Sequence, residues 1–216
     1  QPAPEPPAGA SRLDLRIETG GHSAAIRALA ADATGRFIVT AAEDKSARVW
    51  DAASGRLLRV LRPPSGAGHE GKLYAAAVSP DGAVVAVGGW SAGNEVHVFE
   101  RASGVLLHRV AGLPDVVTRL AFSPDGRLLA IGLWGGHGLR LQAGEQGWRQ
   151  SRPLEGDTDY DGASYGLAFS PDGRRLAASG ADGRLRLYAL APAGLRRVAV
   201  AEAGGQPFGV AFSPDG

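Results

Sequence analysis

Apolar residues stand along this chain in short runs of four to six residues, separated by polar residues, Gly and Pro. In several segments apolar and polar side chains alternate, as in residues 47–50, 96–99 and 185–188. A period of two predicts β-strands with one buried face, and no segment sustains the longer period of an amphipathic helix. The chain is therefore expected to be all-β.

A recurring turn separates the predicted strands. VSPDG ends at Gly82, and FSPDG ends at Gly126, Gly173 and Gly216, so successive glycines are 44, 47 and 43 residues apart. In this turn Pro presets φ, and Gly adopts the left-handed conformation that a tight hairpin needs. Apolar strands flank the first three turns; the predicted pairs are 75–78 with 84–87, 120–122 with 128–131, and 167–169 with 176–178.

Each repeat continues with a third strand and, after a Gly turn, a fourth, such as 57–61 or 105–110. Four strands in 43 to 47 residues are typical of one blade of a β-propeller. The predicted blades cover residues 20–62, 68–110, 113–155 and 162–203, and residues 206–216 start a fifth. Because the last turn falls inside an unfinished unit, residues 12–216 are expected to form a partial propeller, a truncated or open ring.

The chain begins with a different composition. Residues 1–11 are rich in Pro and Ala, which favours a disordered lead, and residues 13–17 alternate as a strand with no blade of its own. We expect residues 12–18 and 206–216 to leave unpaired sheet edges, which promote association between chains.

The first repeat carries the residues that point to a family. Gly21-His22 opens it, Thr40 and Asp44 follow, and Trp50-Asp51 ends its third strand. This pattern resembles the WD-repeat β-propeller family. The resemblance implies a structural tetrad of His22, Thr40, Asp44 and Trp50, in which Asp accepts from both His and the indole while His is bonded to the hydroxyl.

Later repeats depart from this tetrad. In the second, Gly68-His69 is present but Phe99 stands in place of Trp; in the fourth, Asp182 and Tyr188 keep two positions while Ala178 replaces the hydroxyl. The third, around Leu141, keeps none, so we expect packing to hold that blade.

Charge and composition exclude several classes of function. The 23 basic and 22 acidic residues leave a net charge of +1, and the arginines are dispersed, which argues against a nucleic-acid surface. The apolar runs are far shorter than the roughly 20 residues of a membrane-spanning helix. There is no cysteine for a disulfide or a zinc ligand. The four histidines 69, 97, 108 and 137 lack paired ligand spacing.

Three motifs invite a chemical interpretation. A His, a hydroxyl and an Asp in one repeat resemble a catalytic triad, but here they fall at positions that join adjacent strands, and no catalytic role is assigned. Glycine clusters at 88–89 and 135–138 precede no helix and no Gly-Lys-Ser/Thr, which favours hairpin turns over a phosphate loop. Trp90 and Trp134 lie near turns between strands, where they either pack or bind a partner.

The strongest candidate for a metal is calcium. Asp157, Asp159 and Asp161 alternate and Gly162 follows, as in a calcium loop. The twelfth position, which should hold a bidentate Glu, is Ala168. The segment is therefore either half of a calcium site or a solvated acidic loop, and no other cofactor is expected.

Propellers offer rigid faces to other proteins, so the first functional hypothesis is a non-catalytic protein-interaction scaffold, without a nucleic-acid partner and without a membrane span. Stretches at 56–64, 70–82, 112–114 and 159–166 are similar to propeller regions that accompany caspase-like peptidase domains in bacterial proteins. This similarity implies a second hypothesis, a regulatory propeller that contacts other domains of a larger enzyme. A lactonase or metal-hydrolase propeller would need polar ligands at the channel, where small apolar residues are predicted.

The start at Gln1 leaves the compartment open. The Pro-rich opening would suit a segment that follows a cleaved signal peptide, which implies export to the periplasm; an arbitrary cut implies the cytoplasm instead.

Overall fold

The computed structural model describes residues 20–216, and every regular element in this range is a β-strand. Sixteen strands form four antiparallel units of four. The first unit comprises β1 (Ile26–Ala31), β2 (Phe37–Ala42), β3 (Ala47–Asp51) and β4 (Leu57–Leu61), and the second β5 (Leu73–Val78), β6 (Val84–Gly89), β7 (Val96–Glu100) and β8 (Leu106–Val110). The third comprises β9 (Val117–Phe122), β10 (Leu128–Leu133), β11 (Leu139–Glu145) and β12 (Gln150–Asp157), and the fourth β13 (Ser164–Phe169), β14 (Arg175–Gly180), β15 (Arg184–Ala191) and β16 (Gly194–Glu202).

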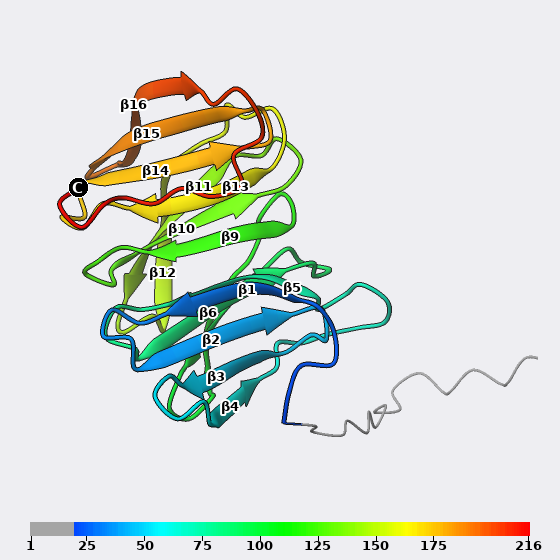
Figure 1. Cartoon of the computed structure of the whole chain (residues 1–216). Coiled ribbons are helices and arrows are strands. Elements are labelled where there is room, and N and C mark those ends of the chain that lie inside the picture. Colours follow the sequence, from blue (N-terminus) through cyan, green and yellow to red (C-terminus); the bar gives the residue numbers. More distant parts are fainter. Residues whose placement is uncertain (1–19) are drawn as a thin grey trace, which may run out of the picture.

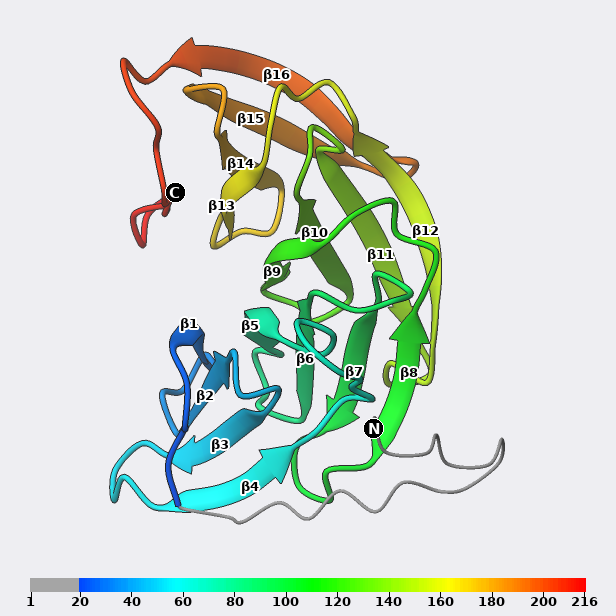
Figure 2. The same ribbon diagram turned by 90° about the vertical axis from the view of Figure 1, so that its right-hand side faces the viewer.

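These units are arranged as the blades of a propeller (Figure 1). In each, the strands follow one another from the inside outward, so β1, β5, β9 and β13 lie around the axis and neighbouring members of this set are in contact. Viewed along the axis, the four sheets fan out in an arc, with β4, β8, β12 and β16 at its outer side (Figure 2). The predicted all-β, four-stranded blade architecture is confirmed.

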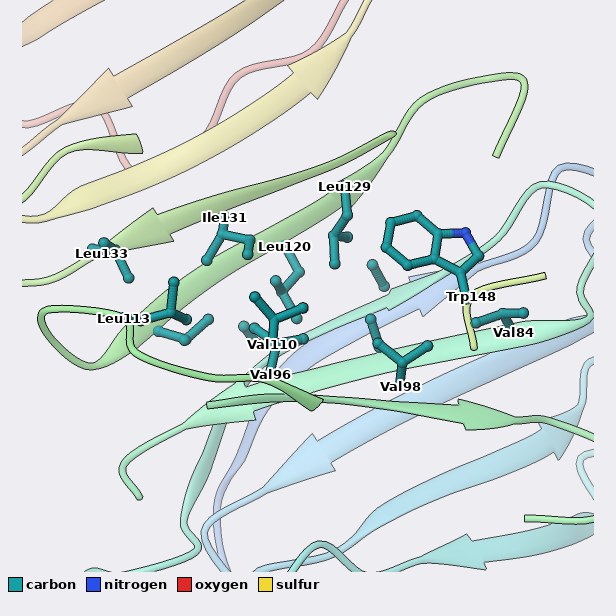
Figure 3. Packing of buried hydrophobic residues seen from close by; sticks show 14 residues of the cluster. Val84, Val96, Val98, Val110, Leu113, Leu120, Leu129, Ile131, Leu133 and Trp148 are labelled. Carbon is teal, nitrogen blue, oxygen red and sulfur yellow. The ribbon is translucent and has the colours of Figure 1, made fainter. Parts of the chain in front are cut away.

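Apolar side chains fill the spaces between successive blades. Between blades 2 and 3, for example, β-branched and Leu side chains of β7, β9 and β10 pack together, and Trp148 lies at one end of the cluster beside Val84 and Leu129 (Figure 3). A second cluster lies between blades 1 and 2, and a third between blades 3 and 4. Because each blade buries both faces only when it has a neighbour on each side, stability depends on the contacts between blades.

The Ser-Pro-Asp-Gly turns have one common hydrogen-bond pattern. In the turn at Ser79, the hydroxyl donates to the Asp81 carboxylate at 2.6 Å and accepts from the Val84 amide at 2.9 Å. The Gly82 amide closes the turn on the Ser79 carbonyl at 2.8 Å. Turns at Ser123 and Ser170 repeat these bonds with Ser-to-Asp distances of 2.5 Å.

The structure also reveals a turn that the sequence pattern did not single out. Asp32 to Gly35 connects β1 to β2, and the Gly35 amide bonds the Asp32 carbonyl at 3.1 Å. Asp32 replaces Ser and Thr34 replaces Asp in this first copy, so it lacks the Ser-Pro-Asp-Gly letters. It lies 47 residues before the Gly82 turn and sets the register of the first blade.

Blades 3 and 4 are also joined at their outer edges. The end of β12 pairs in parallel with the start of β16 through Glu155 and Gly194, and the Glu155 amide donates to the Ala193 carbonyl at 2.8 Å. Gly194 has a φ of 146°, and a Cβ at this position would lie 2.2 Å from the Glu155 carbonyl oxygen. This close approach of two backbones therefore requires glycine.

The C-terminal residues differ from the expected start of a blade. Within the described part of the chain, residues 206–216 join no β-ladder, although the turn forms and the Gly216 amide bonds the Ser213 carbonyl at 3.0 Å. Phe208 stacks on Tyr165 of β13 with ring centroids 5.0 Å apart. The segment lies along blade 4 without a hydrogen-bonded strand to pair with. The predicted lead at 1–11 and strand at 13–17 lie outside the described residues.

Candidate functional site: an aromatic mouth on the propeller

The four predicted tetrad residues lie together in blade 1. The His22 ring places Nδ1 2.9 Å from Asp44 Oδ2 and Nε2 2.7 Å from the Thr40 hydroxyl. The Trp50 indole donates to the same hydroxyl at 2.9 Å. Asp44 thus accepts from His22 but not from the indole, which corrects the expected bonding. The side chains of His22 and Asp44 are only 3% and 7% exposed, so this network ties strands together inside the blade.

Blade 2 does not repeat this network. His69 stands four residues before β5, as His22 does before β1, but it is exposed and its ring lies 6.0 Å from that of Trp90. Val87 occupies the position that Thr40 has in blade 1 and offers no hydroxyl. With no hydroxyl at this position, the His69 ring would have no hydrogen-bond partner there if it pointed into the blade.

Blade 4 contains a different polar network at the corresponding place. Asp182 forms a bidentate ion pair with Arg186, at 2.5 and 3.2 Å, instead of binding a histidine. The Arg186 guanidinium lies 3.9 Å from the centroid of the Tyr160 ring. Tyr188 donates to Asp157 Oδ2 at 2.8 Å, and its hydroxyl lies 3.0 Å from that of Tyr160. Burial raises the pKa of both tyrosines well above the usual range.

Arg197 pairs with two of the three candidate calcium ligands. Its Nη1 lies 2.7 Å from Asp159 Oδ2 and 3.5 Å from Asp157 Oδ2, while Asp157 is also held by Tyr188. Across residues 20–216, no three acidic or histidine side chains converge as metal ligands would. Asp157, Asp159 and Asp161 therefore do not converge here, where an arginine from β16 pairs with the first two carboxylates, and the calcium half-site stays a prediction.

The innermost strands share a β-bulge. In each blade the pairing of the first strand with the second skips one residue, and the skipped residues are Arg27, Tyr74, Thr118 and Tyr165. Each stands eight residues before the glycine of its turn, and Phe208 stands eight before Gly216. A bulge redirects a side chain out of the alternating pattern of the sheet. All five side chains line one cavity of about 520 Å³.

A second set of equivalent positions completes this cavity. Glu43, Trp90 and Trp134 stand eight residues after their turn glycines, directly beyond the ends of β2, β6 and β10. They line the same cavity, together with Val116 and Arg119. Trp90 and Trp134 are 50% and 54% exposed and Phe208 is 65% exposed. We call this set of lining residues the aromatic mouth.

The aromatic mouth opens toward the axis of the propeller. A second cavity, of about 310 Å³, is lined by residues of all four innermost strands and by residues 208–210. Arg27, Arg119, Tyr165 and Phe208 line both cavities. The aromatic mouth therefore adjoins this second cavity at these four residues, and we call the second cavity the channel cavity.

Three charged groups line the aromatic mouth. Glu43 is bonded by Arg27 and by Lys72 Nζ, the latter at 2.7 Å, and these bonds hold the pKa of its carboxyl below the usual range. Arg119 donates to the Thr118 carbonyl at 2.7 Å. Among residues 20–216 no carboxylate lies within ion-pair distance of Arg119.

A comparison with protein families accounts for this geometry. The family model "WD domain, G-beta repeat" matches residues 15–51, 55–100 and 152–189. The chain belongs to the WD40-repeat family. The third blade lies mostly between the matched ranges, which agrees with its lack of every tetrad residue. Instead, Trp148 donates to the Gly126 carbonyl at 2.8 Å and meets Phe122 edge to face.

No curated protein matches the chain closely enough to suggest a function by name. The part of the chain that the structure describes contains no helix long and apolar enough to cross a membrane. WD40 repeats suggest that the partners of this chain are proteins.

Sequence analysis found Trp90 and Trp134 but missed most of the mouth. Tyr74 and Tyr165 stand just before the predicted strands 75–78 and 167–169, Phe208 stands in the predicted start of a fifth blade, and only the spacing from the turn glycine shows that they are equivalent. Counting eight residues to each side of that glycine would have found every lining residue except Val116 and Arg119.

Proposed function

We propose that this WD40 propeller is a non-catalytic scaffold that binds a segment of a partner protein at the aromatic mouth. The observation that carries the proposal is the gathering of three exposed aromatic side chains, Trp90, Trp134 and Phe208, around one cavity. Contiguous exposed apolar surface is costly in water and marks interaction sites, and Trp, Tyr and Arg are the residues that contribute most at protein interfaces.

We assign no catalytic role because the polar side chains of blade 1 are buried and bonded to one another. The triad-like set of His22, Thr40 and Asp44 is buried, and the Thr40 hydroxyl is already bonded by the Trp50 indole. A nucleophile must face a cleft in which substrate can reach it. The aromatic mouth lacks such a set: its polar groups are two arginines, one glutamate, a threonine and two tyrosines.

A selection of random linear peptides displayed on phage tests the proposal. We expect peptides selected on the wild-type chain to lose binding to the Trp90→Ala/Trp134→Ala double variant. They should retain binding to Val105→Ala, which removes an exposed apolar side chain outside the aromatic mouth. Enriched peptides that bind all three proteins alike, or a selection that enriches none, would overturn the proposal.

The link to a caspase-like peptidase stays a prediction, since neither the blade geometry nor the family match bears on it.

A further inference from the structure

Arg119 stands at a position of the repeat where the other repeats have Ala or Gly. This position lies seven residues before the turn glycine, and the other repeats place Ala28, Ala75, Gly166 and Gly209 there. The small residues suit the crowded inner strands near the axis. A long, charged side chain at such a place departs from the local rule, and such departures are expected where a protein binds or reacts.

Among the residues that the structure describes, the Arg119 guanidinium has a protein acceptor for only one of its nitrogen atoms. Of its five N–H donors, Nη1 bonds the Thr118 carbonyl at 2.7 Å, and no carboxylate of residues 20–216 pairs with it. The side chain is half-buried and lines both the aromatic mouth and the channel cavity. Burial lowers the pKa of this guanidinium, but an arginine remains charged at neutral pH.

The other charges of the mouth are already neutralised. Arg27 and Lys72 both bind Glu43, so these three groups form a closed cluster. Arg119 is thus the one cation of the mouth, among the described residues, that remains available for a ligand. Its planar fork suits a carboxylate, which it can bind with two parallel hydrogen bonds, and the apolar walls strengthen such a pair by excluding water.

From this geometry we infer that the aromatic mouth recognises an acidic side chain, Asp or Glu, flanked by apolar residues in a segment of the partner protein. The inference rests on the proposed function and names the chemistry of its ligand. The carboxylate would lie against Arg119, and its apolar neighbours would pack on Trp90 and Trp134. A phosphorylated side chain fits less well, because phosphate sites gather several free cations and here the Glu43 carboxylate stands nearby.

The test uses peptides capped at both ends, so that the central side chain carries their only charge. An array places Glu between every pairing of Leu, Ile, Val, Phe, Tyr and Trp, and matched arrays carry Gln, Lys or phosphoserine at the centre. The strongest Glu peptides and their Gln counterparts are then titrated by fluorescence anisotropy. We expect the Glu peptides to bind the wild-type chain about tenfold more tightly, as a charge-assisted bond to a half-buried arginine implies.

Two variants test whether Arg119 causes the preference for Glu over Gln peptides. Arg119→Gln should reduce the Glu-to-Gln ratio to about one, whereas Arg196→Gln, which removes an exposed charge on β16, should leave it unchanged. Thermal unfolding of both variants shows that each is folded. A ratio near one in the wild type, a ratio that survives Arg119→Gln, or strongest binding by the Lys or phosphoserine array would overturn the inference.

The outcomes also separate this inference from the proposed function. If Glu and Gln peptides bind equally and both lose affinity in Trp90→Ala, the mouth binds partners but Arg119 does not select acidic ones. If no array peptide binds and the phage selection also enriches no peptide, both the inference about Arg119 and the proposed function are wrong.

Discussion

The Trp50 indole donates its hydrogen bond to the Thr40 hydroxyl, 2.9 Å away on the neighbouring strand, and not to the Asp44 carboxylate. Thr40 is therefore the centre of the network: its one hydroxyl bonds both the indole and His22 Nε2. A hydroxyl can accept from the first and donate to the second, which assigns the His22 proton to Nδ1, facing Asp44.

The first prediction concerns this hydroxyl. Thr40→Val keeps the shape of the side chain but leaves two polar groups, on Trp50 and His22, without their partner. We expect the free energy of unfolding to fall by about 1–3 kcal/mol, the cost of leaving buried polar groups unsatisfied. Urea denaturation followed by circular dichroism measures it. Thr158→Val, in an exposed loop, is the matched control, and equal loss in both variants would contradict the central role of Thr40.

A second prediction concerns alkaline pH and Tyr188. Burial raises the pKa of Tyr188 above that of an unfolded tyrosine, which is about 10. Because the folded pKa is the higher one, the stability this group contributes is fully present below about pH 10 and is lost as pH rises further. Tyr188→Phe should lower the unfolding free energy at neutral pH by about 1 kcal/mol, since Asp157 loses a donor. It should also make the fall in stability above pH 10 shallower. An unchanged alkaline profile would contradict this.

The turns should respond to acid. Hydrogen bonds from the serine hydroxyls hold the pKa of Asp81 and Asp172 below the usual range for aspartate. A depressed folded pKa means that the stability is present above the unfolded pKa, about 3.9, and is lost as pH falls below it. Urea midpoints measured from pH 7 down to pH 2 should therefore decline less steeply in Asp81→Asn than in the wild type. Identical slopes would show that this carboxylate does not contribute.

A fourth prediction separates the aromatic mouth from the core. Trp90 and Trp134 are half-exposed, whereas Trp148 is buried between blades. The Trp90→Ala/Trp134→Ala variant should therefore keep its unfolding free energy within about 0.5 kcal/mol per substitution, as expected for surface changes. It should also lose most of the tryptophan fluorescence that acrylamide quenches. Trp148→Ala, by contrast, should cost about 3–5 kcal/mol, because it opens a cavity.

The fifth prediction concerns the joint between blades 3 and 4. Gly194→Ala would place a Cβ against the Glu155 carbonyl, in a backbone conformation that suits only glycine. We expect a loss of about 1–3 kcal/mol from backbone strain and faster hydrogen exchange at the Glu155 amide. Gly205→Ala, where a Cβ meets no other atom, is the control. Unchanged exchange at Glu155 would show that the parallel pairing does not protect it.

The sequence predicted the blades well because their determinants are local. The turn at Ser79 forms through hydrogen bonds within residues 79–84, so its Ser-Pro-Asp-Gly sequence is enough to locate it. The tetrad residues could also be read from spacing, but the acceptor of the Trp50 indole could not, because it depends on the stagger between β2 and β3.

Contacts between segments that are far apart in the sequence could not be predicted from it. Arg197 is 38 residues from Asp159, and nothing in the acidic loop shows that an arginine of β16 occupies it. Likewise, Trp148 packs into the core between blades 2 and 3 although it stands in the turn between β11 and β12. The aromatic mouth had a signal in its spacing, but its meaning depends on the bulge, which changes the direction of one side chain in each inner strand.

That bulge has a consequence for how this protein can diversify. The skipped residue in each blade contributes its side chain to the mouth, while its neighbours on the strand maintain the ladder and the core. Arg27, Tyr74, Thr118, Tyr165 and Phe208 differ in size and charge although they occupy the same place in the repeat. Thr118 also donates to the Ser164 carbonyl of blade 4 at 2.7 Å, so it contributes to the joint between blades 3 and 4. Substitution at the other four sites can thus alter what the propeller recognises while the blades stay as they are, so the fold keeps its architecture and most of its ligand preference on separate sets of residues.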